Sequence, residues 1–193
     1  MVPSILFSGM GGFFVVFAEN FHYNKNKRMR IGGVFMVSVQ AVCNSILKRA
    51  FEQGVAVSPM KLQKILYFVY RDVYQNTKTK LFDEPFQTWK YGPVVRSVYD
   101  EFQAFGCNPI RCFIKDACNR VQIIDERKLP AVAASMDFVW ECCKQKDGIA
   151  LSHLTYTEGS AWWNAYQKDS PILLDEDIFY DRTDITGNRP VRA

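Results

Sequence analysis

The hydrophobic pattern of residues 57–75 predicts one long helix around which the rest of the chain is organised. Ser58 suits the N-cap, because its hydroxyl can accept from an amide one turn later, and Pro59 suits the first helical position. Apolar residues then recur every three or four positions and form one stripe: Leu62, Ile65, Leu66, Val69 and Val73. The pattern places a polar side opposite this stripe: Lys61, Lys64, Arg71 and Gln75. Between the two sides runs a flank of large or amide side chains: Gln63, Tyr67, Tyr70 and Tyr74. We expect a central helix with neighbours on several sides.

The remaining periodicity predicts mostly helices. Helical spacing begins near Val37 and ends at Gly54, and further helices are expected over 93–105, 130–146, 151–157 and 160–167. Phe86–Tyr91 alternates apolar and polar residues, as a strand does, and Gly92-Pro93 is expected to break that strand so that Pro93 opens the next helix. Arg111–Ile114 and Arg120–Ile124 are expected to form a hairpin around residues 116–119. The predicted fold class is mainly α (α+β): a compact bundle of about five to seven helices with a small two- to three-stranded β element.

The ends of the chain are predicted to lie outside the domain. Residues 1–35 combine a short, glycine-containing apolar run with a following basic cluster, and their composition over Phe17–Lys27 resembles translated non-coding DNA. We expect a non-native leader there, or a disordered one, with translation starting at Met36. The domain is expected over residues 36–182. The acidic stretch that begins at Asp175 offers a place where a protease could engage, and residues 183–193 are expected to be a disordered tail.

Charge argues against a dedicated nucleic-acid binder. The formal net charge of the chain is +4, but residues 1–35 carry most of it, so the predicted domain is close to neutral. A nucleic-acid-binding domain usually shows a concentrated basic face. No stretch of the sequence is long and apolar enough to predict a membrane span.

The cysteines do not predict a metal centre. The sequence holds 6 cysteines, none in a C-x-x-C spacing, and His153 is the only suitable imidazole ligand outside the leader. A disulfide framework or a zinc site stays open as an alternative. We expect free thiols in a reducing cytoplasm, with no cofactor.

The motifs that usually reveal an enzyme are also missing. The sequence contains no phosphate-binding glycine loop, dinucleotide-binding turn, nucleophile elbow or zinc-protease helix. The paired carboxylates Asp83-Glu84 and Asp125-Glu126 fall in polar turns, where a solvated loop explains them. We therefore predict no catalytic residues and a protein that is not an enzyme.

Two segments together resemble the Panacea domain, the SocA-like antitoxin family. Residues 58–68, with Lys61, Leu62, Gln63 and Lys64 in succession, are similar to its first signature, and residues 86–95, with Trp89 followed by Gly92-Pro93, to its second. Residues 151–163 are a weaker match, in which Tyr156 stands where the family commonly has histidine. The resemblance spans roughly residues 39–169. It implies a mostly helical bacterial or phage-associated protein with a small β element beside the Gly-Pro turn.

The resemblance also implies a function. Such proteins neutralise a cognate toxin, often encoded by an adjacent gene, by direct protein binding, and at least one type delivers its toxin to a cytoplasmic ATP-dependent protease. The expected function is therefore that of an antitoxin in the cytoplasm, with a toxin as partner. Two alternatives stay open: a DNA-binding regulator of its own operon, and a metal-dependent enzyme.

The residues expected to contact a partner are aromatic, amide and basic side chains near the two signatures, because such side chains dominate binding hot spots. They are Lys61, Gln63, Lys64, Tyr67, Trp89, Lys90 and Tyr91. The competing interpretation is that Tyr67, Trp89 and Tyr91 are packing residues that hold the strand against the central helix.

Overall fold

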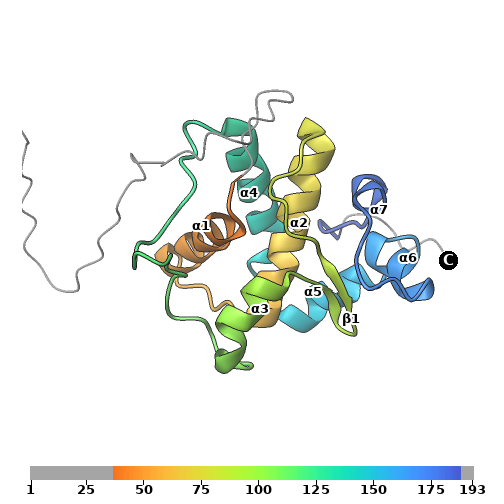
Figure 1. Ribbon diagram of the computed structural model, residues 1–193, viewed down its shortest axis with the longest axis horizontal. Coiled ribbons are helices and arrows are strands. Elements are labelled where there is room, and N and C mark those ends of the chain that lie inside the picture. The colour runs from red at the N-terminus through yellow and green to blue at the C-terminus, as the bar shows by residue number, and fades with distance from the viewer. Residues whose placement is uncertain (1–36, 188–193) are drawn as a thin grey trace, which may run out of the picture.

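The fold is built around one helix that is buried on all sides. The computed structural model describes residues 37–187, and there α2 (Pro59–Thr77) runs through the middle of the molecule with the other elements around it (Figure 1). Ser58 caps α2 by accepting from Lys61 N, and Pro59 occupies its first turn. Every residue from Lys61 to Arg71 is buried. The prediction of a capped central helix is confirmed.

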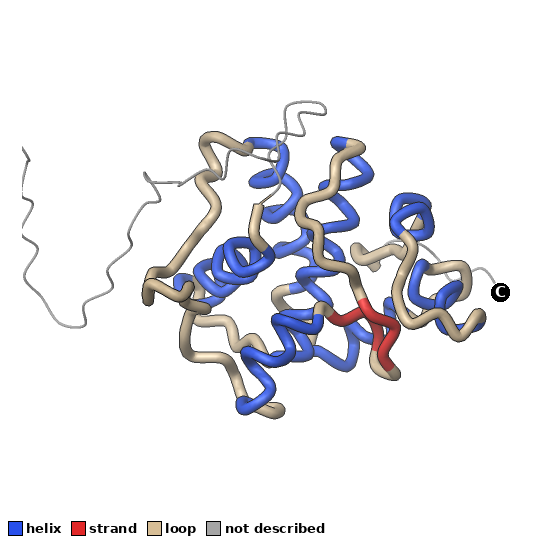
Figure 2. Tube along the Cα trace, in the orientation of Figure 1, coloured by secondary structure: helices blue, strands red, loops and turns tan. Residues whose placement is uncertain are grey.

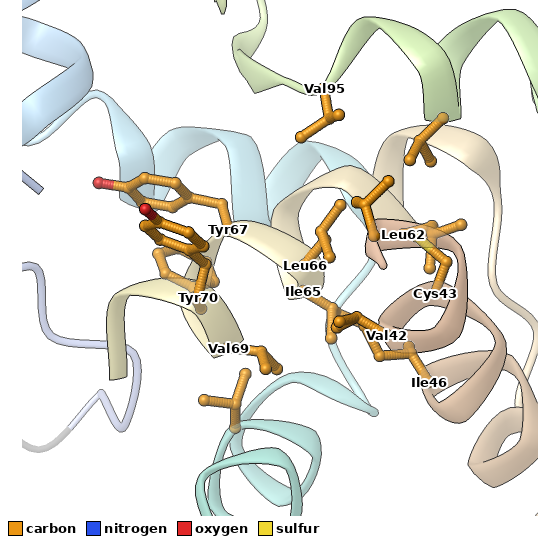
Figure 3. Close-up of a cluster of buried hydrophobic side chains, with 14 of the residues drawn as sticks. Val42, Cys43, Ile46, Leu62, Ile65, Leu66, Tyr67, Val69, Tyr70 and Val95 are labelled. Carbon is orange, nitrogen blue, oxygen red and sulfur yellow. The ribbon is translucent and has the colours of Figure 1, made fainter. Parts of the chain in front are cut away.

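The apolar stripe of α2 packs against α1 (Val39–Glu52). Figure 3 shows Leu62 and Ile65 facing Val42, Cys43 and Ile46 of α1, while Tyr67 and Tyr70 extend from another side of α2. All of these side chains are at most 2% exposed. Burying a large apolar side chain contributes about 1.5–3 kcal/mol, so this contact is a main source of the stability of the fold.

The prediction that α2 has a polar side away from the core is wrong. Lys61, Lys64 and Arg71 are at most 6% exposed, because helices and loops cover that side as well. Each side chain finds an acceptor there: Lys61 Nζ donates to Lys144 O, Lys64 Nζ to Pro93 O, and Arg71 Nη1 to Asp181 Oδ1. A lysine or arginine stem is largely apolar, so it can be buried wherever an acceptor meets its tip.

The other helices surround α2, and all of them except α4 have at most 8 residues. They are α3 (Arg96–Phe102), the 3-10 turn η1 (Gln103–Phe105), α4 (Pro130–Cys143), α5 (Gly148–Thr155), α6 (Ala161–Gln167) and α7 (Asp175–Tyr180). Asp147 caps α5 and Ser160 caps α6 by accepting from backbone amides. With seven α-helices and one two-stranded sheet over residues 37–187, the predicted fold class is confirmed. No helix in this part of the chain is long and apolar enough to span a membrane.

The small sheet is a hairpin, drawn in red in Figure 2. β1 (Gln87–Trp89) pairs antiparallel with β2 (Gly92–Val94), with Trp89 opposite Gly92 and Lys90 and Tyr91 as the tip. The expected break at Gly92-Pro93 is wrong, since both residues belong to β2 and α3 begins only at Arg96. Pro93 fits here because it lies opposite Thr88, whose N–H bonds instead to Pro171 O on the other side.

The hairpin expected over 111–124 is reduced to one bridge between Lys115 and Val121. The backbone of both segments bonds instead to side chains of α1. Asn44 accepts from Ile114 N and donates to the carbonyls of Ile114 and Gln122, and Ser45 accepts from Ile124 N. Polar side chains of a helix thus replace the strand partner that the alternation had predicted.

The C-terminal segment differs from the prediction as well. The acidic stretch forms the helix α7, whose Ile178 is 1% exposed. Thr183 and Ile185, at the start of the expected disordered tail, are buried too, and Thr183 N donates to Asp181 Oδ1. Packing of these side chains against the core explains the difference as far as Ile185. The proposed leader and start at Met36, and residues 188–193 of the tail, lie outside the described residues.

Candidate partner-binding site

The hairpin is attached to α2 by an amide side chain that acts as a strand partner. Gln63 Oε1 accepts from Val95 N at 2.9 Å, and Gln63 Nε2 donates to Val95 O at 3.1 Å. All of these groups are buried. A reciprocal pair of this kind fixes both the distance and the orientation of the segment that leaves β2, because each buried group loses its partner if the other moves.

The next residue of α2 holds the hairpin one step nearer its tip. Lys64 is 1% exposed and its Nζ donates to Pro93 O at 2.9 Å. Burial lowers the pKa of the Lys64 ammonium to about 7, since the charged form is the more costly one to remove from water. The backbone of Gly92 (φ +98°) lies so close that a Cβ there would be 2.7 Å from both Lys64 Nζ and Thr155 Oγ1. Only glycine fits this position without displacement.

Three more carbonyls of the hairpin are held by α5, α6 and the segment between them. Ser152 Oγ donates to Tyr91 O at 3.1 Å, Tyr156 OH to Lys90 O at 3.3 Å and Trp162 Nε1 to Trp89 O at 2.9 Å. The backbone carbonyls of three consecutive residues at the tip are therefore each held by a hydrogen bond from this side of the molecule. A loop fixed in this way loses little conformational entropy when it binds a partner.

The side chains of the tip face solvent. Tyr91 is 56% exposed and Lys90 is exposed, with its Nζ 5.3 Å from the centre of the Tyr91 ring. Trp89 is half-buried: its ring packs edge-on against Tyr99 at 4.6 Å, and its Nε1 donates to Gln87 Oε1. The tip thus presents an aromatic ring and a cation on a rigid support.

The seven predicted contact residues fall into two groups. Lys61, Gln63, Lys64 and Tyr67 are buried and bond to backbone carbonyls, an amide or a carboxylate of the same chain. Trp89, Lys90 and Tyr91 lie at the accessible hairpin, and Gln63 and Lys64 hold that hairpin from inside. The structure therefore brings five of the seven into one unit, in which α2 supplies the support and the tip supplies the surface.

Tyr156 and Tyr166 are not among the contact residues predicted from the sequence, although both lie beside the tip. Trp162 stacks on Tyr166 at 4.6 Å and lies 4.7 Å from Tyr156, which contacts the tip through its hydroxyl. Tyr166 is 48% exposed and Tyr156 is half-buried. The pKa of Tyr156 is raised, first by burial and then by the nearby Tyr91. Tyr91, Tyr156 and Tyr166 form a patch that we call the tyrosine patch. The pair Trp162-Trp163 in the sequence could have indicated this patch. The periodicity of a helix as short as α6, however, does not show which of its sides is exposed.

A buried carboxylate connects α2 to the C-terminal segment. Asp181, 2% exposed, accepts from Tyr67 OH, from Arg71 Nη1 at 3.3 Å and from Ala161 N at 3.1 Å. Burial and the neighbouring Asp181 raise the pKa of Tyr67 well above its ordinary value. This cluster fixes the N-terminus of α6, from which Trp162 reaches the hairpin.

Candidate groups for metal chemistry are not brought together. The cysteines are free thiols, and over residues 37–187 no set of His, Cys, Asp and Glu side chains is arranged to hold a metal ion. A hollow of ≈ 210 Å³ between the starts of α2 and α5 is lined by Lys61 and Asp147, among others. Both are already engaged, Lys61 with Lys144 O and Asp147 with Ala150 N. The docked hairpin is the stronger candidate for function.

Comparisons with known proteins point to one family. A family model described as "Antitoxin SocA-like, Panacea domain" matches residues 62–163, which include Gln63, Lys64, the hairpin and Trp162. The curated protein "Antitoxin SocA" of Caulobacter vibrioides (strain NA1000 / CB15N) is 34% identical over 90 residues, which cover 46% of this chain and 48% of that protein. The chain thus spans about half the length of the curated relative that it matches. No solved structure matches it.

Proposed function

Because the chain belongs to the SocA-like Panacea-domain family of antitoxins, we propose that it neutralises a cognate toxin by binding that toxin directly through the exposed hairpin tip. The observation that carries the proposal is the overlap of two features. The residues that build the hairpin tip and those that fix it, Gln63, Lys64 and Trp162, all lie within the residues matched by the family model. A family with a binding role and a rigid, exposed aromatic loop together favour that loop as the contact.

The chemistry of the tip supports a protein partner. Tyr91 and Lys90 combine a large amphipathic ring with a cation, and the tyrosine patch extends the ring surface to α6. Tyrosine is enriched among the residues that carry most of the binding energy in protein interfaces, and a preorganised loop avoids part of the entropic cost. In this mechanism the protein has no catalytic step: the toxin is inhibited because its active surface is covered, or because the complex is handed to an ATP-dependent protease.

The first prediction concerns growth. Co-expression of this chain with the toxin, which we expect an adjacent gene to encode, is expected to restore growth that the toxin alone arrests. Growth curves and a pull-down of the two proteins measure the effect. Toxin abundance in the same cells distinguishes sequestration, in which the toxin persists, from proteolytic delivery, in which it disappears. A chain that neither binds any neighbouring gene product nor relieves its toxicity would contradict the proposed function.

The second prediction concerns the tip itself. Tyr91→Ala is expected to weaken toxin binding about thirtyfold, because losing a central hot-spot residue costs about 2 kcal/mol or more. Isothermal titration calorimetry with the purified toxin measures the change. The matched control is Tyr180→Ala on α7, since Tyr180 is 63% exposed and Tyr91 is 56% exposed. Equal affinities for the two variants would remove the tip as the contact while leaving the antitoxin function in place.

A further inference from the structure

Lys64 lacks the partner that a buried ammonium normally has. An ammonium offers three N–H donors, and over residues 37–187 its one hydrogen bond is to Pro93 O, with no ion pair. The other buried cations of α2 differ. Arg71 pairs with Asp181, and for Lys61 burial lowers the pKa while Cys143 and Asp147 oppose that shift. Lys64 has only the lowering effect of burial.

Over residues 37–187, no ion pair offsets a positive charge on Lys64. The buried carboxylate of Asp181 is engaged by Tyr67 OH and Arg71 Nη1. On α2 the titratable neighbours one turn away are Lys61 and Tyr67, and on the hairpin the titratable groups are Lys90 and Tyr91. On and just after α5 they are His153, which is exposed, and Tyr156, with Thr155 facing the amine. None of these neighbours is a carboxylate. A buried ammonium with one carbonyl acceptor is costly, whereas the neutral amine donates to the same carbonyl at little cost.

We propose that Lys64 is a proton-sensitive positioning residue, which holds the hairpin against α2 as an uncharged amine and releases the hairpin tip when Nζ is protonated. The tip that moves carries Lys90 and Tyr91, so the consequence for partner binding rests on the proposed function. The proposal that protonation of Lys64 controls docking of the hairpin does not depend on that function.

The sign of the pH dependence follows from the two states of the amine. In the docked hairpin the pKa of Lys64 is about 7, and in a released, solvated hairpin it returns to the ordinary 10.5. The docked state therefore binds fewer protons between these values, and docking strengthens as the pH rises. From pH 8 to pH 6 the equilibrium constant for docking of the hairpin is expected to fall about tenfold, mostly between pH 8 and pH 7.

Two measurements on the full chain without toxin test this proposal. The ¹³Cε resonance of Lys64 reports its titration directly and needs no variant; a midpoint near 7 is expected, and a midpoint near 10 would overturn the proposal. The amide of Val95 bonds to Gln63 Oε1 across the docked interface, so its hydrogen-exchange protection, corrected for the intrinsic rate at each pH, reports docking.

Variants separate Lys64 from other titrating groups. In the unmodified chain and in His153→Gln, Val95 protection is expected to fall about tenfold from pH 8 to pH 6, whereas in Lys64→Met it is expected to stay constant. The same decline in Lys64→Met would overturn the proposal, as would constant protection in the unmodified chain. If Lys64→Met does not fold, the ¹³Cε midpoint decides alone. Because no toxin is present, a failure here leaves the antitoxin function untouched, and a failed growth test leaves this result untouched.

Discussion

Replacing Asp181 with alanine is expected to lower the free energy of unfolding by about 3–5 kcal/mol, the usual cost of removing one member of a buried ion pair. The side chain of Asp181 is completely buried, and its two oxygens accept from Tyr67 OH, Arg71 Nη1 and two backbone amides. Without the carboxylate, the Arg71 cation and the Tyr67 hydroxyl stay buried with no acceptor. Since a domain is stable by only about 5–15 kcal/mol, this loss removes a large part of the stability and shifts the unfolding midpoint strongly.

Urea unfolding followed by circular dichroism measures this loss. The control is Asp100→Ala on α3, which removes a carboxylate from an exposed i,i+4 pair with Arg96 and is expected to change the midpoint little. A second variant, Asp181→Asn, keeps the shape and the acceptor oxygen but removes the charge, and is expected to fall between the two. If Asp181→Ala unfolds at the same urea concentration as Asp100→Ala, the cluster does not stabilise the fold as the structure indicates.

Gly92→Ala is expected to cost about 3 kcal/mol and to detach the hairpin from α2. Two effects add. A positive φ costs a residue with a Cβ about 1–2 kcal/mol, and overpacking a tight contact costs about 1–3 kcal/mol. The new methyl group would lie 2.7 Å from Lys64 Nζ and from Thr155 Oγ1, so Lys64, which holds the hairpin, and Thr155 must both move. The unfolding midpoint, Val95 amide protection and toxin affinity are all expected to fall.

A second glycine, which also has a positive φ but has no atoms near its Cβ position, separates these two effects. Gly54 has a φ of +64°, and no atom lies within 4 Å of the position that a Cβ would occupy there, so Gly54→Ala is expected to show only the conformational cost of about 1–2 kcal/mol. Its Val95 protection is expected to equal that of the unmodified chain. Val95 protection that stays unchanged in Gly92→Ala would show that the hairpin tolerates the extra methyl group.

The sequence was sufficient to predict α2, its cap and the fold class, because caps and apolar periodicity are local signals. It could not reveal that Lys61, Lys64 and Arg71 are buried. Periodicity reports the polarity of side chains, whereas burial depends on how many elements pack around the helix. The acceptors of these residues come from Lys144, Pro93 and Asp181, far away along the chain.

The same limit applies to the irregular regions. The alternation over 111–124 predicted a hairpin, but only one bridge forms there, and Ile114 bonds to the Asn44 side chain of α1, which no strand pattern can indicate. The helix α7 has only 6 residues, too few for a periodic signal, and its acidic composition resembles a solvated tail. Its place in the core depends on Ile178 and on the carboxylate of Asp181, which follows it.

For the candidate site, the two signatures named the segments that we propose as the partner-binding unit, but they could not indicate that Gln63 and Lys64 are buried. As a partner surface these residues were expected to face outward; in the structure they bond to Val95 and Pro93, so one signature binds the other. In this chain the two segments therefore fold as one unit. We propose that partner contacts are confined to the tip and the tyrosine patch, where side chains can vary without disturbing the support.

The buried position of Asp181 also has a practical consequence for engineering. The family match ends at residue 163, yet the carboxylate that satisfies Tyr67 and Arg71 lies beyond that border, and α1, which covers Ile65, precedes the match. A fragment cut at the borders of the match would carry an orphaned cation and an uncovered apolar face. Chimeras that exchange recognition loops between relatives should therefore keep both flanks from one parent and transplant only the short turn.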